Sequence, residues 1–241
     1  MSFGPGPLSP ALKGLIGANV ALFVLQVLAQ MAGWHLDWYF GLRPDQVLGE
    51  FRIWQLVSYM FLHGGVFHIL FNMLALWMFG TELERIWGRA YFLKFYFVTG
   101  IGAGALTVLV SLLPFGFAQD LQHSIVIGAS GAIYGLLLAY GMYFPDRPIY
   151  MYLVFPIPAK YFVMIMGALA FYSSLTERSG VANATHLGGL LVAYLFMKGG
   201  RMHPWSEVKY RYLKWKIAKA RSKFDVYTGG RADSDWNRRI H

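Results

Sequence analysis

Six apolar runs divide the chain, and they constrain its fold more than any other feature. They cover residues 12–31, 66–86, 91–113, 125–144, 160–176 and 182–198. A helix needs about 20 apolar residues to cross a hydrocarbon core of about 30 Å, and each run is near that length. Backbone N–H and C=O groups cannot stay unpaired in lipid, so such runs fold as helices. The sequence therefore predicts an all-α polytopic membrane protein with six spans.

The composition supports several spans rather than one large soluble core. Hydrophobic residues make up 56% of the chain, whereas soluble domains are usually about 45–50% apolar. The first run follows a nearly uncharged N-terminus and is longer than the apolar core of a signal peptide, so we expect it to be retained as a span. The chain has no cysteine, so disulfide bonds contribute nothing to the fold.

Positive charge is concentrated after the last apolar run. Of the 21 Lys and Arg residues, twelve lie from Lys198 onward, and the formal net charge is +9. Such a charge can indicate nucleic-acid binding, but no recognition motif accompanies it. We predict a six-span core over residues 1–200 and a basic amphipathic cytoplasmic tail over 201–241. The expected partner of this tail is the inner surface of the lipid bilayer, not a nucleic acid.

The loops set the orientation of the spans. If the N-terminus is cytoplasmic, the inside segments hold 18 Lys and Arg residues and the outside segments hold three. The positive-inside rule therefore predicts that both termini are cytoplasmic. The first outside loop, residues 32–65, is long and rich in aromatic residues, so we expect it to have structure of its own and to lie partly in the outer leaflet. The lack of a targeting extension favours a prokaryotic plasma (inner) membrane.

Four polar residues converge at one depth in this topology. The second, fourth and sixth spans run from outside to inside, and near their outer ends they carry His68 with Asn72, Ser130, and His186. Ser130 lies about five residues into the fourth run, or about 8 Å below its head, because a helix rises about 1.5 Å per residue. Reactive groups are costly to place in lipid, so their convergence predicts a functional site.

The residue types at this depth indicate acyl-transfer chemistry. A serine hydroxyl needs a nearby base to become a nucleophile, and His186 can take the proton of Ser130 and return it to a leaving amine. The Ser130 amide, His68 and Asn72 can donate hydrogen bonds to the oxyanion of a tetrahedral intermediate. No Asp or Glu lies in these spans at a matching depth. We therefore predict a catalytic Ser130–His186 dyad rather than a triad.

Glycines and one aromatic residue support this site. Gly128 and Gly131 bracket the serine and permit close approach of backbone, a neighbouring helix or substrate. Tyr134 lies one turn after Ser130, on the same helix face, and is expected to stack on His186. Two small-residue pairs would let the fourth and sixth spans pack closely: Gly131 with Gly135, and Gly189 with Ala193.

These residues and their spacing resemble the rhomboid family of intramembrane serine proteases. The resemblance covers about residues 10–200, and its motifs are His68-x-x-x-Asn72, Glu84 with Gly88, Gly128-Ala129-Ser130-Gly131, Tyr134, and Ala182-Asn183-x-x-His186-x-x-Gly189. It implies a six-helix rhomboid-like bundle that acts as a serine endopeptidase. The implied substrates are single-pass transmembrane proteins, cut at or just inside the outer face. The implied oxyanion hole consists of His68, Asn72 and Ser130, and the fifth span with the loop before His186 would form a lateral gate.

The chain departs from the family pattern at three places. The first loop usually carries a Trp-Arg pair, whereas here Trp54 is followed by Gln55. Either Arg52 substitutes for the missing arginine or the loop is held differently. Ala193 stands where the family has glycine, and Thr185 replaces a common alanine. We expect these last two changes to affect packing more than chemistry.

Two other functions fit parts of the pattern. A non-catalytic adaptor that binds client helices would have the same fold, with Ser130 or His186 dispensable. A small transporter or proton relay would normally place ionisable residues at mid-membrane and show a repeat between its halves, and neither is evident. No metal or cofactor is expected, because the chain lacks an H-E-x-x-H motif and its carboxylates lie elsewhere.

Overall fold

The computed structural model describes residues 6–151, 155–176 and 181–201. The chain divides into two compact units, Met1–Lys198 and Gly199–His241. The predicted tail, residues 201–241, falls almost wholly outside the described residues. Its amphipathic helix and its boundary therefore stay predictions.

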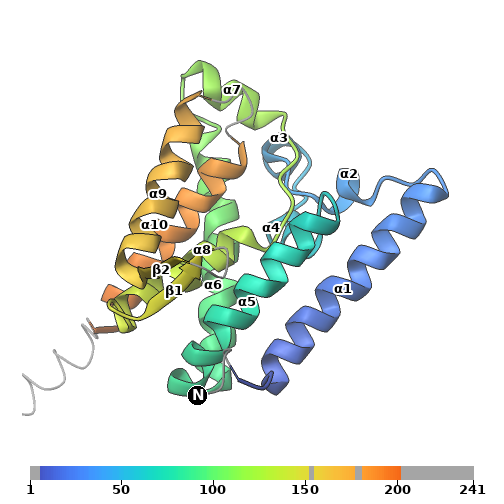
Figure 1. Ribbon diagram of the computed structural model, residues 1–241. Helices are drawn as coiled ribbons and strands as arrows, with labels where there is room; N and C mark the ends of the chain where they lie inside the picture. Colours follow the sequence, from blue (N-terminus) through green and yellow to red (C-terminus); the bar gives the residue numbers. More distant parts are fainter. Residues whose placement is uncertain (1–5, 152–154, 177–180, 202–241) are drawn as a thin grey trace, which may run out of the picture. The chain divides into compact units, whose positions relative to one another are not determined.

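The described part of the chain is mostly helical, as the apolar runs predict (Figure 1). The helices that correspond to the six runs are α1 (Pro10–Met31), α5 (Val66–Trp87), α6 (Arg89–Val110), α8 (Ser130–Tyr143), α9 (Ala159–Thr176) and α10 (Val181–Arg201). By length and composition, α1, α5 and α6 can each cross a membrane, and α9 contains a shorter apolar helix, Ala159–Ser173. The prediction of a mostly helical membrane protein is confirmed, whereas the count of six spans stays a prediction.

The centre of the first unit is formed where α5, α6 and α8 pack together. Large side chains without solvent exposure fill it, among them Phe92, Phe95, Tyr96, Leu76 and Leu136. Helix α1 packs on α5 and α9 packs on α8, so both lie at the margin of the bundle (Figure 1). Many apolar side chains of α1 are exposed, for example Leu25 and Leu28. Such a face suits contact with lipid rather than water.

Glycines bring α10 against α8 at one point. A Cβ atom on Gly189 would lie 2.0 Å from the carbonyl oxygen of Gly131, so the two backbones are in direct contact. A Cβ atom on Gly135 would instead lie 2.9 Å from the Cβ atom of Thr99, which belongs to α6. The prediction of close packing through small residues is therefore right for Gly131 and Gly189. It is wrong for Gly135, because the next turn of α8 faces α6.

The loop between α1 and α5 has structure of its own. It contains α2 (Leu36–Phe40), α3 (Pro44–Gly49), α4 (Gln55–Ser58) and the 3-10 turn η1 (Tyr59–Phe61). A further short helix, α7 (Gly116–Gln122), lies in the connection between α6 and α8 and contacts both α3 and α6. The α1–α5 and α6–α8 connections therefore pack on each other.

The fourth apolar run is not helical throughout. Residues 125–127 are not helical, Leu42 and Val126 exchange two backbone hydrogen bonds of 2.9 Å, and the chain bends at Gly128 and turns at Ala129 before the helix begins at Ser130. Gly128 has φ +126°, a conformation outside the helical region and open mainly to glycine. Ser130 is thus the first residue of its helix and not one turn inside it, which corrects the predicted span 125–144.

An antiparallel hairpin separates α8 from α9. Strands β1 (Pro148–Met151) and β2 (Phe155–Pro158) pair from Pro148 with Pro158 to Met151 with Phe155. The prolines of this segment disfavour helix, because they lack an N–H group and clash with the preceding turn. The all-α prediction missed this hairpin, although it describes the spans correctly as helical.

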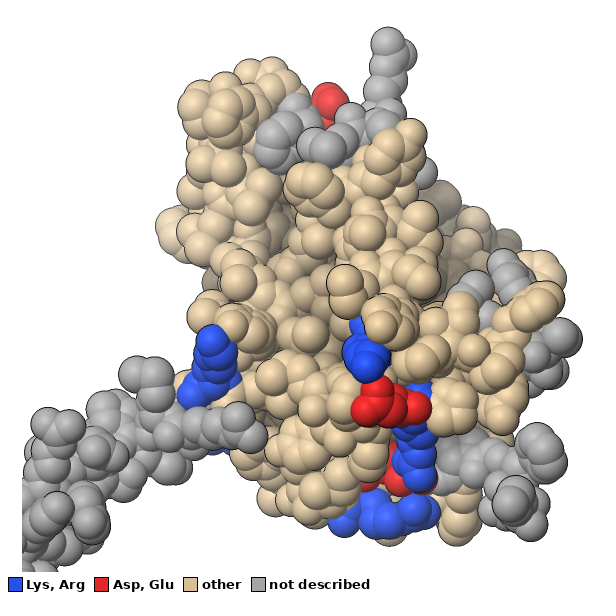
Figure 2. Space-filling view, turned by 60° about the vertical axis from the view of Figure 1, so that its left-hand side comes forward, with Lys and Arg blue, Asp and Glu red and all other residues tan. Residues whose placement is uncertain are grey.

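Charged side chains gather at the end of the bundle where α5 ends and the hairpin lies, below a largely uncharged face (Figure 2). Arg147 pairs with Glu82 at 3.1 Å, and Lys160 pairs with Asp146 at 2.7 Å. At the same end the Ser9 hydroxyl donates to the Glu84 carboxylate and accepts the Leu12 amide, which caps α1. Glu84 therefore joins the start of α1 to the end of α5.

Candidate active site

Ser130 and His186 meet at the start of α8 and in the second turn of α10. The Ser130 Oγ atom lies 2.8 Å from His186 Nε2, which is hydrogen-bonding distance. The close contact of Gly131 with Gly189 explains this approach, because each glycine lies within one turn of one partner. The two residues are 56 positions apart in the sequence, so only the packing of α8 on α10 brings them together.

The imidazole of His186 is held by a ring stack. The Tyr134 and His186 rings are nearly parallel at 7°, with centroids 4.2 Å apart, as the sequence predicts. The other ring nitrogen, Nδ1, is buried and has no hydrogen-bond partner among the described residues. Ring stacking, rather than a carboxylate, therefore orients His186 in the described part of the chain.

His68 lies beside the segment that leads to Ser130. Its Nδ1 atom accepts a hydrogen bond of 3.2 Å from the Gly64 amide, so a neutral ring carries its proton on Nε2. A Cβ atom on Gly128 would lie 2.8 Å from His68 Nε2 and 3.7 Å from Ser130 Oγ. The donor nitrogen and the serine hydroxyl thus face the same glycine.

Asn72 is placed less directly. Its side chain is buried, and Nδ2 donates to the His68 carbonyl oxygen at 3.0 Å, one turn earlier on α5. An amide carries two N–H groups, so one remains for another acceptor. The structure therefore brings His68 to Gly128 and Ser130, whereas the recorded bond of Asn72 is to its own helix.

Thr185, the residue before His186, ties α10 to α6. Its hydroxyl lies 2.8 Å from that of Thr107, which also donates to the Ala103 carbonyl at 2.9 Å. Because the Thr185 side chain is buried, its hydroxyl needs a hydrogen-bond partner, and the Thr107 hydroxyl provides one. The threonine at this position thus adds a hydrogen bond between α10 and α6 that an alanine could not make.

Three further residues, Gln26, His63 and Tyr59, support the site and are not among the residues predicted for it. Gln26 of α1 accepts the His63 amide and donates to the His63 carbonyl, each at 3.1 Å. The His63 ring packs edge-on against His68, with centroids 5.1 Å apart. The Tyr59 carbonyl accepts the Gly128 amide at 2.9 Å. A polar glutamine inside the first apolar run was the one visible signal, and the other contacts depend on the tertiary fold.

Gln55 holds the first loop in the place of the expected arginine. It is fully buried and bonds to Arg43, Gln46 and Tyr39. The Arg52 guanidinium pairs with Glu50 at 2.6 Å and also donates to Gln46 Oε1 at 3.4 Å. The loop is thus held mainly by Gln55, in line with the second of the two predicted alternatives, and Arg52 adds one bond to the same Gln46 oxygen.

Comparison with known proteins agrees with these motifs. The sequence model of the rhomboid domain matches residues 50–201. The chain belongs to the rhomboid family. It is 32% identical to mitochondrial Rhomboid protein 1 of Saccharomyces cerevisiae over 188 residues, which is 76% of this chain and 51% of that protein. It is also 32% identical to the rhomboid protease GluP of Bacillus subtilis, over 63% of this chain and 27% of that protein.

Membership of the rhomboid family makes the chain an integral membrane protein, but it leaves the type of membrane open. RHOMBOID-like protein 2 of Arabidopsis thaliana is 31% identical over 62% of this chain and 43% of that protein. The matched relatives thus come from a bacterium, a yeast mitochondrion and a plant, and the predicted prokaryotic plasma membrane is not supported. The chain spans about half the length of these relatives or less.

Proposed function

We propose that this rhomboid is an intramembrane serine endopeptidase in which Ser130 is the nucleophile and His186 the base. The observation that carries the proposal is the 2.8 Å contact between Ser130 Oγ and His186 Nε2 inside an apolar bundle. A hydroxyl and an imidazole at this distance can exchange a proton, which is the requirement for serine activation. The similarity to GluP of Bacillus subtilis, which is named as a rhomboid protease, supports the same activity.

The reaction proceeds in two steps. His186 Nε2 takes the Ser130 proton as Oγ attacks the scissile carbonyl, and the imidazolium then protonates the leaving amine as the C–N bond breaks. In the second step His186 removes a proton from water, which attacks the acyl-enzyme ester and releases Ser130. Tyr134 holds the imidazole plane during both transfers by its stack at 4.2 Å.

Three donors form the proposed oxyanion hole. The Ser130 amide is available because the first N–H groups of a helix have no partner within it, and Ser130 begins α8. His68 contributes Nε2–H, since Nδ1 is occupied by the Gly64 amide. Asn72 contributes its second amide hydrogen. The Gly128 amide is not a candidate, because it already bonds to the Tyr59 carbonyl.

The proposed substrates are single-pass transmembrane proteins. With six spans and both termini cytoplasmic, Ser130 and His186 lie near the outer face, so the cut falls at or just inside that face. Residues 1–200 form the protease core and residues 201–241 a basic tail on the inner membrane surface. Helix α9 and the loop before His186 form the proposed gate, and residues 177–180 of that loop lie outside the described residues.

The test uses the purified chain in liposomes with a tagged single-pass substrate. Wild-type protein should cut the substrate near the outer end of its span, and Ser130→Ala and His186→Ala should each abolish cleavage. Ser124→Ala and His35→Ala serve as matched controls, because Ser124 bonds to the Asp120 carbonyl on the surface and the His35 side chain is 65% exposed. Mass spectrometry locates the cut.

The outcomes separate the protease from its main alternative. Cleavage that persists near the wild-type rate in Ser130→Ala would contradict the nucleophile. If wild-type protein cuts no substrate and Ser130 takes no label from a fluorophosphonate probe, while substrate helices still bind, the chain is a client-binding adaptor instead.

A further inference from the structure

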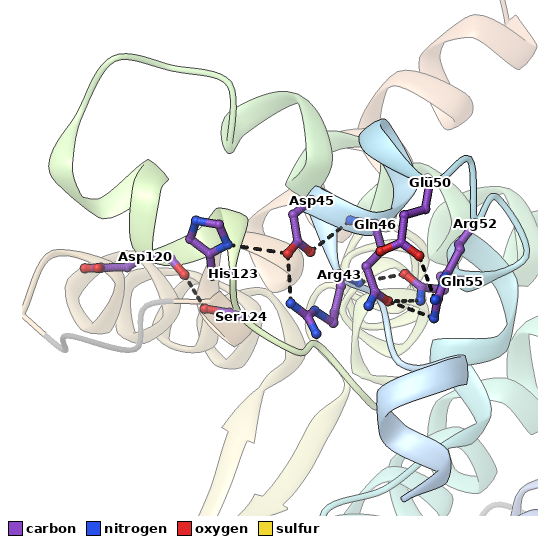
Figure 3. Close-up of polar contacts among 9 residues, drawn as sticks. All are labelled: Arg43, Asp45, Gln46, Glu50, Arg52, Gln55, Asp120, His123 and Ser124. Carbon is purple, nitrogen blue, oxygen red and sulfur yellow. Dashed lines mark hydrogen bonds and ion pairs between the residues drawn. The ribbon is translucent and has the colours of Figure 1, made fainter.

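A buried glutamine organises the outer loop. Gln55 has no solvent exposure, and its side-chain oxygen accepts the Arg43 backbone amide at 3.0 Å. Its amide nitrogen donates to Gln46 Oε1 at 2.8 Å and to the Tyr39 carbonyl at 3.3 Å. Figure 3 shows the side chains of Gln55, Gln46 and Arg52 converging on this point. One side chain thus holds residues 39, 43 and 46 together.

The segment that Gln55 holds is also the one that supports the path to Ser130. Leu42, between Tyr39 and Gln46, exchanges both backbone hydrogen bonds with Val126 at 2.9 Å. Two residues later, Gly128 donates to the Tyr59 carbonyl at 2.9 Å. Val126 and Gly128, in the segment that leads to Ser130, therefore have backbone partners in the outer loop. The course of this segment sets where α8 begins, and hence where Ser130 lies.

A neutral side chain suits this position because cations already surround it. The Arg43 guanidinium lies 4.1 Å from the Trp38 ring centroid and bonds to Asp45 at 2.8 Å, and its side chain is 10% exposed. Arg52 donates to Gln46 Oε1 at 3.4 Å from the other side. A glutamine supplies both an acceptor and a donor here without adding a third charge.

We propose that Gln55 is a positioning residue for Ser130, acting through the Leu42–Val126 backbone pair. The hydrogen bonds of the Gln55 side chain go to Tyr39, Arg43 and Gln46, not to Ser130 or His186. Gln55 fixes the Tyr39–Gln46 segment, and this segment in turn fixes residues 125–129. The inference rests on the proposed function, since it takes Ser130 to be the nucleophile. It predicts that loss of Gln55 misplaces a nucleophile whose own residues are unchanged.

The first part of the test is Gln55→Ala, with Gln119→Ala on the exposed side of α7 as the matched control. Gln55→Ala removes three hydrogen bonds and takes from the buried Arg43 backbone amide its acceptor, Gln55 Oε1. This loss should lower both the rate of fluorophosphonate labelling of Ser130 and kcat by about tenfold or more. KM for the substrate should change much less, because the bundle that would receive the substrate helix is intact. Gln119→Ala should match wild type in all three measurements.

The second part asks whether the Leu42–Val126 pair transmits the effect. The chain has no cysteine, so a single disulfide can be introduced cleanly. Residues that exchange both hydrogen bonds across an antiparallel pair have Cα atoms about 5.5 Å apart, within the range that a disulfide spans. The test variant is Gln55→Ala/Leu42→Cys/Val126→Cys, and the reference is Leu42→Cys/Val126→Cys with Gln55 intact. When both are oxidised, the test variant should label at a rate within about threefold of the reference. Reduction of the disulfide should remove this gain in the test variant.

The outcomes distinguish this inference from the proposed function. If wild-type protein neither labels nor cleaves, the assignment of Ser130 has failed. If wild-type protein is active and Gln55→Ala labels equally fast, Gln55 does not position Ser130. If the oxidised triple variant regains its thermal midpoint but labels as slowly as the reduced form, Gln55 acts on stability alone, and the inference is overturned.

Discussion

Gly128 combines two constraints that no other residue type satisfies. Its φ of +126° lies where L side chains are strained, and a Cβ atom would lie 2.8 Å from the Nε2 atom of His68. A methyl group there must either rotate the backbone before Ser130 or push His68 away. Both movements disturb the proposed oxyanion hole.

We therefore expect Gly128→Ala to lower kcat by about 100-fold, the size of effect typical for loss of an oxyanion donor. Substrate cleavage and fluorophosphonate labelling measure it. Gly49→Ala is the control, because a Cβ atom at Gly49 meets nothing within 4 Å. Activity near wild type in Gly128→Ala would mean that His68 is not a donor.

His63 lies in the α1–α5 connection, just before α5, and we expect it to make stability depend on pH. Burial, with a smaller contribution from neighbouring His68, lowers the pKa of His63 from 6.5 to about 4. Between about pH 6.5 and 4, His63 is therefore mostly protonated in the unfolded chain and mostly neutral in the folded protein. This contribution destabilises the protein progressively as the pH falls from about 6.5 to 4, by at most about 3 kcal/mol.

His63→Phe removes that titration and keeps a ring against His68. The thermal midpoint in detergent should fall less steeply between pH 7 and 4 in His63→Phe than in wild type. The exposed His35→Phe should leave the wild-type slope in place. Equal slopes in wild type and His63→Phe would show that the folded protein accommodates a charged His63.

At the scale of the helices, the approach of α10 to α8 depends on Gly189. Its Cβ position is 2.0 Å from the Gly131 carbonyl oxygen, so Gly189→Ala must separate the two helices by more than 1 Å. A displacement of about 1 Å at reacting groups can cost about 100-fold in rate, and overpacking costs about 1–3 kcal/mol of stability.

We expect Gly189→Ala to lose cleavage by about that factor and to lower the thermal midpoint. Gly14→Ala on α1 is the matched control in an apolar helix, since a Cβ atom there meets nothing within 4 Å. A wild-type rate in Gly189→Ala would indicate that Ser130 and His186 meet without this helix contact.

At the scale of the whole molecule, the proposed protease core and the basic tail should be separable. The described contacts of Ser130 and His186 all come from residues before Lys198. Truncation after Met202 should therefore leave kcat within about twofold in detergent, well under the tenfold change that would mark a lost catalytic interaction. It should weaken binding to anionic liposomes, because each basic residue near such a surface contributes about 1 kcal/mol. Loss of all cleavage by folded, truncated protein would contradict the division at residue 200.

Much of this protein could be predicted from the sequence because the governing interactions are local. Run length and polarity predict helices at α1, α5, α6, α9 and α10, since a helix satisfies its own backbone in lipid. Spacing within one helix predicts that Tyr134 follows Ser130 on one face and that His68 precedes Asn72 by one turn. The motifs on and beside α5, α8 and α10 indicate the rhomboid family, which the comparisons confirm.

Only the tertiary structure decided the features that join distant segments. Val126 lies in an apolar run and reads as helix, yet its backbone pairs with Leu42, 84 residues earlier, so α8 starts at Ser130. Gln55 and Thr185 each looked like a departure from the family pattern, and each proved to be matched by a hydrogen bond in another part of the fold. Composition and periodicity describe how a segment satisfies its own backbone. They carry no information on which remote atom completes a buried polar group, because that choice depends on how the whole chain packs.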